Sequence, residues 1–164
     1  MRYKAKIFHA VILPRLLYGS ESWALSNKNI ERLRVVQRKM ERGMLNKRIQ
    51  DRLPSAVIRG ITRLTDVATV AAKHKLNFAY RIAHMPESRW SLVVSEWCPY
   101  NRKRSPGRPI VRWRDELVEA VRSNNTAARR GRIRPAPIRG EEILRACRDI
   151  KIWRAVKEHH FATM

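Results

Sequence analysis

The chain has 164 residues, and its 36 Lys and Arg against 14 Asp and Glu give a formal net charge of +22 and a pI of about 11.4. Self-repulsion of this size destabilises a compact chain unless a polyanion relieves it, so nucleic acid is the favoured partner. No window approaches the roughly 20 apolar residues of a spanning helix, and residues 7–18 lack a small-residue cleavage site, so we expect neither a membrane partner nor a signal peptide.

The first apolar run covers residues 7–18. Pro14 lies inside it and is expected to bend or end a helix, because proline lacks the backbone donor and crowds the preceding turn. Gly19 follows and is expected to form a turn or a helix C-cap.

The clearest helix prediction covers residues 27–45, with Ser26 at the N-cap position. Apolar residues repeat there at helical spacing, namely Ile30, Leu33, Val36, Met40 and Met44. Much of the remaining circumference is basic, and only Glu31 and Glu41 offset it. A solvated face is the ordinary alternative, but the excess of one sign favours contact with phosphate. The candidate binding residues of this helix are Arg32, Arg34, Arg38, Lys39 and Arg42.

Two more helices are predicted before Pro86. A short one covers residues 55–64, and Thr65 is expected to cap the next, which Pro86 stops. The buried stripe expected for this longer helix consists of Val67, Val70, His74, Phe78, Ile82 and Met85. Residues 88–97 are apolar around Trp90, which is a candidate for partial exposure, and their periodicity does not separate a helix from a strand.

Residues 102–109 form a predicted basic turn, and Pro109 is expected to open a helix that runs to about residue 122. Further candidate phosphate-binding residues are Arg102, Lys103, Arg104, Arg108 and Arg112. The Gly-Arg-Pro step at 107–109 resembles the core of a minor-groove AT-hook, but Pro106 stands where the hook has Arg, so a turn is favoured. Trp113, Leu117 and Val121 share one helix face and are assigned to the core.

The C-terminal part begins with a predicted flexible basic loop over residues 123–140. A last helix follows, and its expected buried stripe consists of Leu144, Cys147, Ile150, Trp153 and Val156.

The sequence lacks the constellations that catalysis needs. A two-metal polymerase or nuclease requires clustered carboxylates, and the pair Asp115-Glu116 is expected to be solvated surface. The histidines and the two cysteines are scattered, so we expect no metal site, no cofactor and no disulfide. The cysteine usage favours a reducing, intracellular location, in the nucleus or the cytoplasm. The chain alone is therefore not expected to be an enzyme.

Four segments carry a family resemblance. Residues 13–23 read Leu-Pro-Arg-Leu-Leu-Tyr-Gly-Ser-Glu-Ser-Trp, residues 37–42 read Gln-Arg-Lys-Met-Glu-Arg, and residues 107–115 read Gly-Arg-Pro-Ile-Val-Arg-Trp-Arg-Asp. Residues 147–153 hold Cys-Arg-Asp followed by a tryptophan. In this order they resemble the thumb and post-thumb region, C-terminal to the catalytic palm, of reverse transcriptases from non-LTR (LINE-like) retrotransposons.

The resemblance implies an all-α fold with two parts. Residues 1–86 would form a small thumb-like helical bundle, and residues 87–164 a basic, loop-rich helical C-terminal region. The palm, the fingers and the endonuclease would lie outside this chain, which would bind RNA or an RNA–DNA template–primer. A helical remnant or interaction module that folds only against its palm is the alternative that we keep open.

Overall fold

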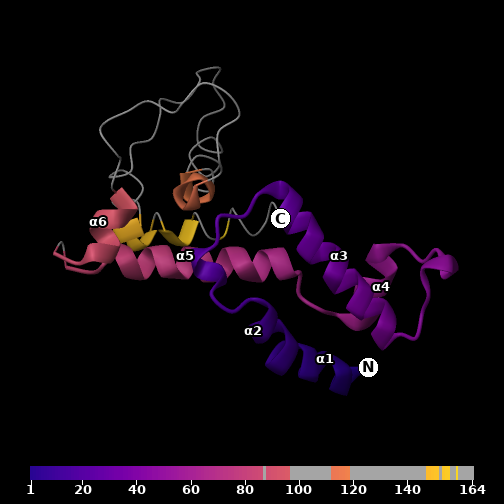
Figure 1. Ribbon diagram of the computed structural model, residues 1–164. Coiled ribbons are helices and arrows are strands. Elements are labelled where there is room, and N and C mark those ends of the chain that lie inside the picture. The colour runs from indigo at the N-terminus through magenta and orange to yellow at the C-terminus, as the bar shows by residue number, and fades with distance from the viewer. Residues whose placement is uncertain (87, 97–111, 119–146, 152, 156–157, 159–164) are drawn as a thin grey trace, which may run out of the picture. The chain divides into compact units, whose positions relative to one another are not determined.

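The computed structural model describes residues 1–86, 88–96, 112–118, 147–151, 153–155 and 158 (Figure 1). None of these residues lies in a strand, so the predicted all-α class is confirmed. The basic turn with Pro109, the loop 123–140 and three expected core residues (Val121, Leu144 and Val156) lie outside the described residues. No helix in the described part is long and apolar enough to cross a bilayer.

The N-terminal helical run passes through Pro14 instead of ending there. It consists of α1 (Arg2–Ile7), a π-helical segment (Phe8–Ile12) and α2 (Leu13–Leu16), which holds Pro14 in its first turn. The π turn, with hydrogen bonds between residues five apart, interrupts the regular register just where the proline ring would clash. The run therefore does not end at Pro14, although its regular α-helical hydrogen bonding is interrupted just before the proline, and Gly19, with φ of 69°, makes the expected turn.

Helix α3 (Asn27–Met44) confirms the clearest sequence prediction, and the Ser26 hydroxyl accepts a hydrogen bond from the Asn29 N–H at 3.4 Å. Its two fully buried side chains are polar, Gln37 and Glu41. Val36, one residue of the apolar stripe at helical spacing, is 41% exposed. The apolar residues of that stripe therefore border a polar contact on the inner face.

Helix α4 (Ser55–Thr62) lies where a short helix was expected, and α5 (Val67–Ala83) ends before Pro86. Thr65 is not the N-cap of α5, because the helix begins at Val67 and Asp66 occupies the N-cap position; the Val67 N–H donates to Gln37 Oε1 at 2.7 Å. The buried face of α5 is also broader than predicted and rich in alanine. Its small buried residues are Ala68, Ala71, Ala72, Ala79 and Ala83. Residues 90–96 form helix α6 (Trp90–Glu96), which settles the choice between helix and strand.

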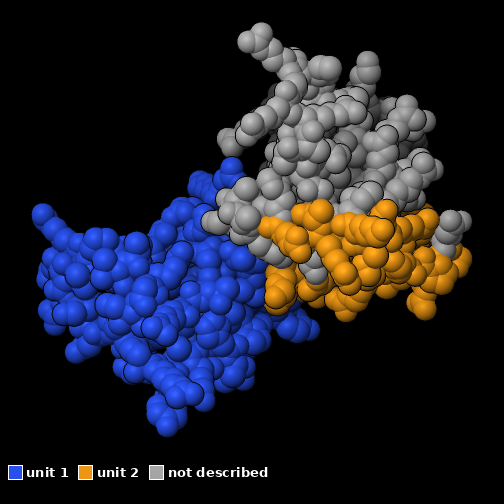
Figure 2. All heavy atoms as spheres, turned by 180° about the vertical axis from the view of Figure 1, so that it is seen from behind, with its two compact units in different colours: residues 1–20, 25–72 blue, residues 21–24, 73–164 orange. Residues whose placement is uncertain are grey.

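The chain divides into two compact units (Figure 2). Unit 1 comprises Met1–Ser20 and Leu25–Ala72, and unit 2 comprises Glu21–Ala24 and Lys73–Met164, so α5 begins in one and continues into the other. In unit 1 the buried apolar side chains include Phe8, Leu17 and Ile58, and the Lys4 ammonium donates to the Met44 carbonyl at 2.8 Å. The expected division into domains at residue 86 stays a prediction.

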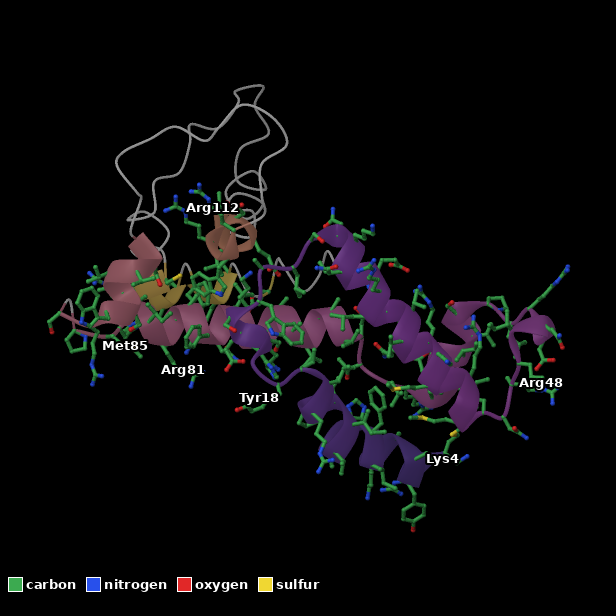
Figure 3. The ribbon with its side chains drawn as sticks, viewed as in Figure 1. Lys4, Tyr18, Arg48, Arg81, Met85 and Arg112 are labelled. Atoms are coloured by element: carbon green, nitrogen blue, oxygen red, sulfur yellow. The ribbon has the colours of Figure 1, made fainter. Side chains whose placement is uncertain are left out.

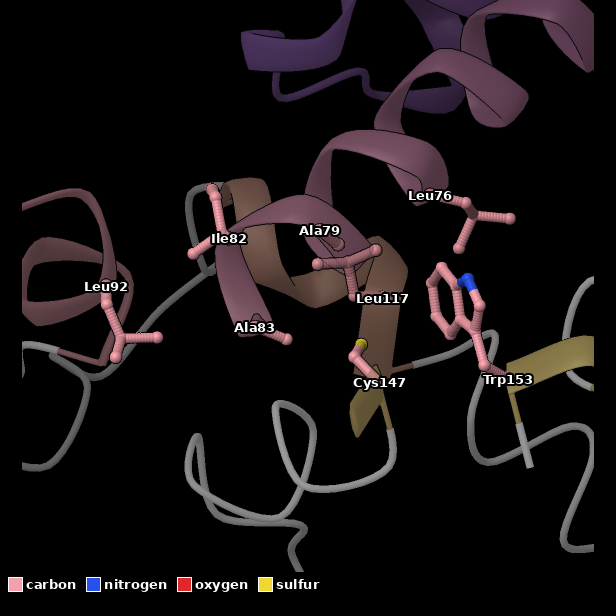
Figure 4. Close-up of a cluster of buried hydrophobic side chains, with 8 residues drawn as sticks. All are labelled: Leu76, Ala79, Ile82, Ala83, Leu92, Leu117, Cys147 and Trp153. Atoms are coloured by element: carbon pink, nitrogen blue, oxygen red, sulfur yellow. The ribbon is translucent and has the colours of Figure 1, made fainter. Parts of the chain in front are cut away.

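Unit 2 has its own hydrophobic core (Figure 4). Side chains from α5, α6, the helical residues 113–118 and the C-terminal residues meet there, namely Leu76, Ala79, Ile82, Ala83, Leu92, Leu117, Cys147 and Trp153. Trp113 packs against this cluster, which confirms the assignments of Trp113, Leu117, Cys147 and Trp153 to the core. Ile150 is 49% exposed, so its place in the buried stripe was wrong.

Candidate nucleic-acid interface

The outer face of α3 presents exposed cations. Arg32 and Lys39 are separated by seven residues, so they lie within about 20° of one another and about 10.5 Å apart along the axis, and both are exposed. Lys28 is exposed on the same face. Within the described part of the chain, the side chains of Arg32 and Lys39 make no ion pair and no hydrogen bond. These side chains can therefore turn towards an anionic ligand without breaking an internal contact.

Two other predicted binding residues of α3 are engaged within unit 1. Arg34 Nε lies 3.3 Å from Asp66 Oδ2, and Arg59 Nη2 lies 3.3 Å from the other carboxylate oxygen of Asp66. Arg38 pairs with Glu31, and this hydrogen bond lowers the pKa of the Glu31 carboxyl below its usual value. A phosphate that binds Arg34 or Arg38 must compete with a carboxylate. Arg42 is half-buried.

The orientation of α3 within unit 1 depends on a buried amide. Gln37 Nε2 donates to Glu41 Oε1 at 2.8 Å and to the Thr65 carbonyl at 3.0 Å, while its oxygen accepts from the Val67 N–H. Because Val67 is the first residue of α5, Gln37 satisfies a backbone donor that the helix itself cannot satisfy. The same contacts hold the inner face of α3 against the start of α5, and they leave the face of Arg32 and Lys39 outward.

In unit 2 the structure describes one of the five predicted binding residues that lie in and after the basic turn. Arg112 is exposed, and its N–H donates to Asp115 Oδ2 at 2.8 Å (Figure 3). This bond caps the N-terminal end of the helical residues 113–118, because the carboxylate of a residue in the first turn accepts from a backbone N–H that the helix leaves unpaired. The remaining four, Arg102, Lys103, Arg104 and Arg108, lie outside the described residues.

A buried ion pair in unit 2 was not foreseen. The Lys75 side chain is 3% exposed, and its ammonium donates to Glu116 Oε2 at 2.6 Å and to the Trp23 carbonyl at 3.0 Å. The Trp113 indole N–H donates to the Glu21 carbonyl at 2.6 Å. These bonds join residues 21–24 to residues 113–116, so two of the segments that carry the family resemblance meet in space. One sequence signal existed, since Lys75 falls between the buried alanines of α5 at helical spacing.

The described residues hold no group of three His, Cys, Asp or Glu side chains that could bind a metal ion. Burial raises the pKa of the Cys147 thiol to about 12. Since the thiolate is the reactive form, Cys147 is an inert member of the core.

Comparison with known proteins gives one relationship. No protein-family model matches the chain, and no solved structure matches it. An uncharacterized transposon-derived protein of Caenorhabditis elegans is 31% identical over 124 residues, which are 73% of this chain and 44% of that protein. The chain thus spans less than half the length of this relative, and its similarity is to a protein of transposon origin.

Proposed function

Proceeding from this similarity to a transposon-derived protein, we propose that the chain is a nucleic-acid-binding, non-catalytic piece of a non-LTR retrotransposon reverse transcriptase. It binds RNA or an RNA–DNA template–primer through contacts with phosphate groups, inside the cell. The observation that carries the proposal is the exposed, internally unpaired Arg32 and Lys39 on α3 in a chain of net charge +22. The retroelement parentage is supported by the ordered resemblance of residues 13–23, 37–42, 107–115 and 147–153.

The physical basis of binding is release of counter-ions. Each Lys or Arg that neutralises a phosphate frees condensed cations, so affinity falls linearly with salt on logarithmic axes. Such contacts position a nucleic acid without reading its sequence. For about six to eight neutralised phosphates, the slope of log K against log salt is roughly −4 to −7.

The test is a salt titration by fluorescence anisotropy, with a labelled single-stranded RNA and a labelled RNA–DNA duplex. We expect the slope given above between about 50 and 200 mM salt. A shallow slope, or no binding at the lowest salt, refutes the proposal. No polymerase or nuclease activity is expected in the same samples.

A matched pair of variants locates the interface. Arg32→Ala with Lys39→Ala removes two exposed cations from α3, and Lys73→Ala with Lys151→Ala removes two exposed cations from elsewhere. The α3 variant should flatten the slope by about 1 to 2, because each lost phosphate contact removes roughly one. An equal reduction of the slope in the two variants would show that binding depends only on the total charge and that α3 is not the interface.

The second candidate function is an interaction module that docks on a polymerase palm or fingers. One observation favours it: Tyr3, Ile7 and Val11 are 80%, 57% and 47% exposed along the N-terminal helical run, and Tyr18 in the turn after it is 86% exposed. Clustered exposed apolar residues mark interaction surfaces. Size-exclusion chromatography and thermal unfolding of the isolated chain separate the two functions. A cooperative, monodisperse chain favours the independent binding domain, whereas aggregation or a broad transition favours the docking module.

A further inference from the structure

A small apolar groove lies on the surface of unit 2. Its volume is about 380 Å³, within the size range of small-ligand pockets, and α5 lines it with Phe78 and Ile82 while α6 lines it with Trp90 and Val94. Trp113 also lines the groove. Trp90 is 79% exposed and Val94 is 62% exposed. An exposed tryptophan beside an aromatic groove is costly to leave in water, which points to a ligand with an apolar surface.

The aromatic wall of the groove is held rigidly. The Trp113 indole donates its N–H to the Glu21 carbonyl at 2.6 Å, and the Lys75 ammonium lies 5.7 Å from the ring centroid. Phe78 packs edge-on against Trp113, with centroids 6.1 Å apart and ring planes at 87°. A flat ligand in the groove therefore meets two rings, Trp113 and Phe78, whose positions are already fixed, so these two lose little conformational entropy on binding.

The charge around the groove favours an anionic ligand. The Arg81 guanidinium lies 5.7 Å from the Phe78 ring centroid, and no Asp or Glu is among the described residues that line the groove. A flat, apolar body with an attached negative charge is the chemistry of a nucleotide in a single strand.

We infer that this groove holds an unpaired base of a single-stranded nucleic acid, stacked against Trp90. The inference rests on the proposed function and adds a second mode of contact to the phosphate contacts of α3. The Ser95 hydroxyl donates to the Ser91 carbonyl at 2.7 Å, and its oxygen remains an acceptor for a base amino group. Because a paired base is stacked within its own duplex, the groove distinguishes single strands from duplexes.

The experiment compares two labelled oligonucleotides of equal length with the full chain. One is oligodeoxythymidylate, and the other is an abasic strand with the same phosphates and no bases. Stacking of one base is worth a factor of roughly 5 to 150 in affinity, so the wild type should prefer the base-bearing strand by that factor. Trp90→Ala should abolish most of the preference and leave the affinity for the abasic strand unchanged.

Two further variants serve as controls. Trp90→Phe keeps an aromatic face and should retain much of the preference, while Tyr18→Ala removes an aromatic side chain that is 86% exposed in unit 1 and should retain all of it. Equal wild-type affinity for both strands, or an equal loss for both strands in Trp90→Ala, overturns the base-binding groove and leaves phosphate binding standing. If neither strand binds, the base-binding groove fails, while the proposed function stands or falls with the salt titration on RNA and the RNA–DNA duplex.

Discussion

Replacing Glu116 by alanine tests whether the Lys75–Glu116 pair is a buried contact that stabilises unit 2. Glu116 Oε2 accepts from the Lys75 ammonium at 2.6 Å, and the two side chains are 20% and 3% exposed. Alanine would leave the ammonium in the interior with the Trp23 carbonyl, 3.0 Å away, as its remaining hydrogen-bond partner in the described part of the chain.

The size of the effect follows from burial. Removing one partner of a fully buried pair costs about 3–5 kcal/mol, because an uncompensated charge remains inside. The partial exposure of Glu116 and the retained bond to Trp23 reduce this, so we expect a loss of about 2–4 kcal/mol in the free energy of unfolding. For a chain of this length such a loss lowers Tm by roughly 4–16 °C.

The measurement is urea unfolding of the full chain, monitored by circular dichroism and by tryptophan fluorescence. Lys75→Met with Glu116→Leu removes both charges and should cost under about 1 kcal/mol, since an apolar pair of similar volume commonly replaces a buried ion pair without loss. Glu158→Ala, at an exposed helical position, should stay within about 0.5 kcal/mol. A loss below about 0.5 kcal/mol in Glu116→Ala would mean that the pair is solvated and that the reasoning from burial is wrong.

Three further predictions concern the other buried and paired groups. Gln37→Leu should lower the free energy of unfolding by about 2–3 kcal/mol in urea titrations, because the Val67 N–H loses its acceptor in a buried site. The pKa of Cys147 is raised from 9.0 to about 12, so between these values the folded chain binds more protons than the unfolded chain. The free energy of unfolding should therefore fall as pH rises through this window. Cys147→Ala should show a smaller fall, which is measured by comparing the urea midpoints of the wild type and the variant across the same pH range. Glu31→Gln should raise affinity for RNA several-fold in anisotropy titrations, because Arg38 no longer pairs with a carboxylate; an unchanged affinity would place Arg38 outside the interface.

Local chemistry in the sequence was enough to locate much of the helical structure. Ser26 could be recognised as the cap of α3, and a short helix was expected where α4 begins at Ser55, because capping and periodicity depend on residues within a turn or two. Core positions such as Leu117 and Trp153 were also predictable, since large apolar side chains at helical spacing need a buried face.

The candidate interface was predictable only in part. The charge of +22 and the basic face of α3 follow from composition and periodicity. Whether a cation of α3 is paired or unpaired depends on where carboxylates lie in space. The partner of Arg34, Asp66, is 32 residues away. No spacing rule within one helix gives that distinction.

The amino-acid sequence by itself determined the helical class and the basic character, and it supplied the prediction of residues for phosphate contact. The tertiary structure alone decided that Gln37 and Glu41 face inward, that Lys75 is buried against Glu116, and that Trp90 stands exposed beside a groove. A polar side chain is stable in the interior only when another segment supplies its hydrogen-bond partner. For Gln37 and Lys75 such partners lie 28 to 52 residues away along the chain, so folding brings them together and local sequence patterns do not record it.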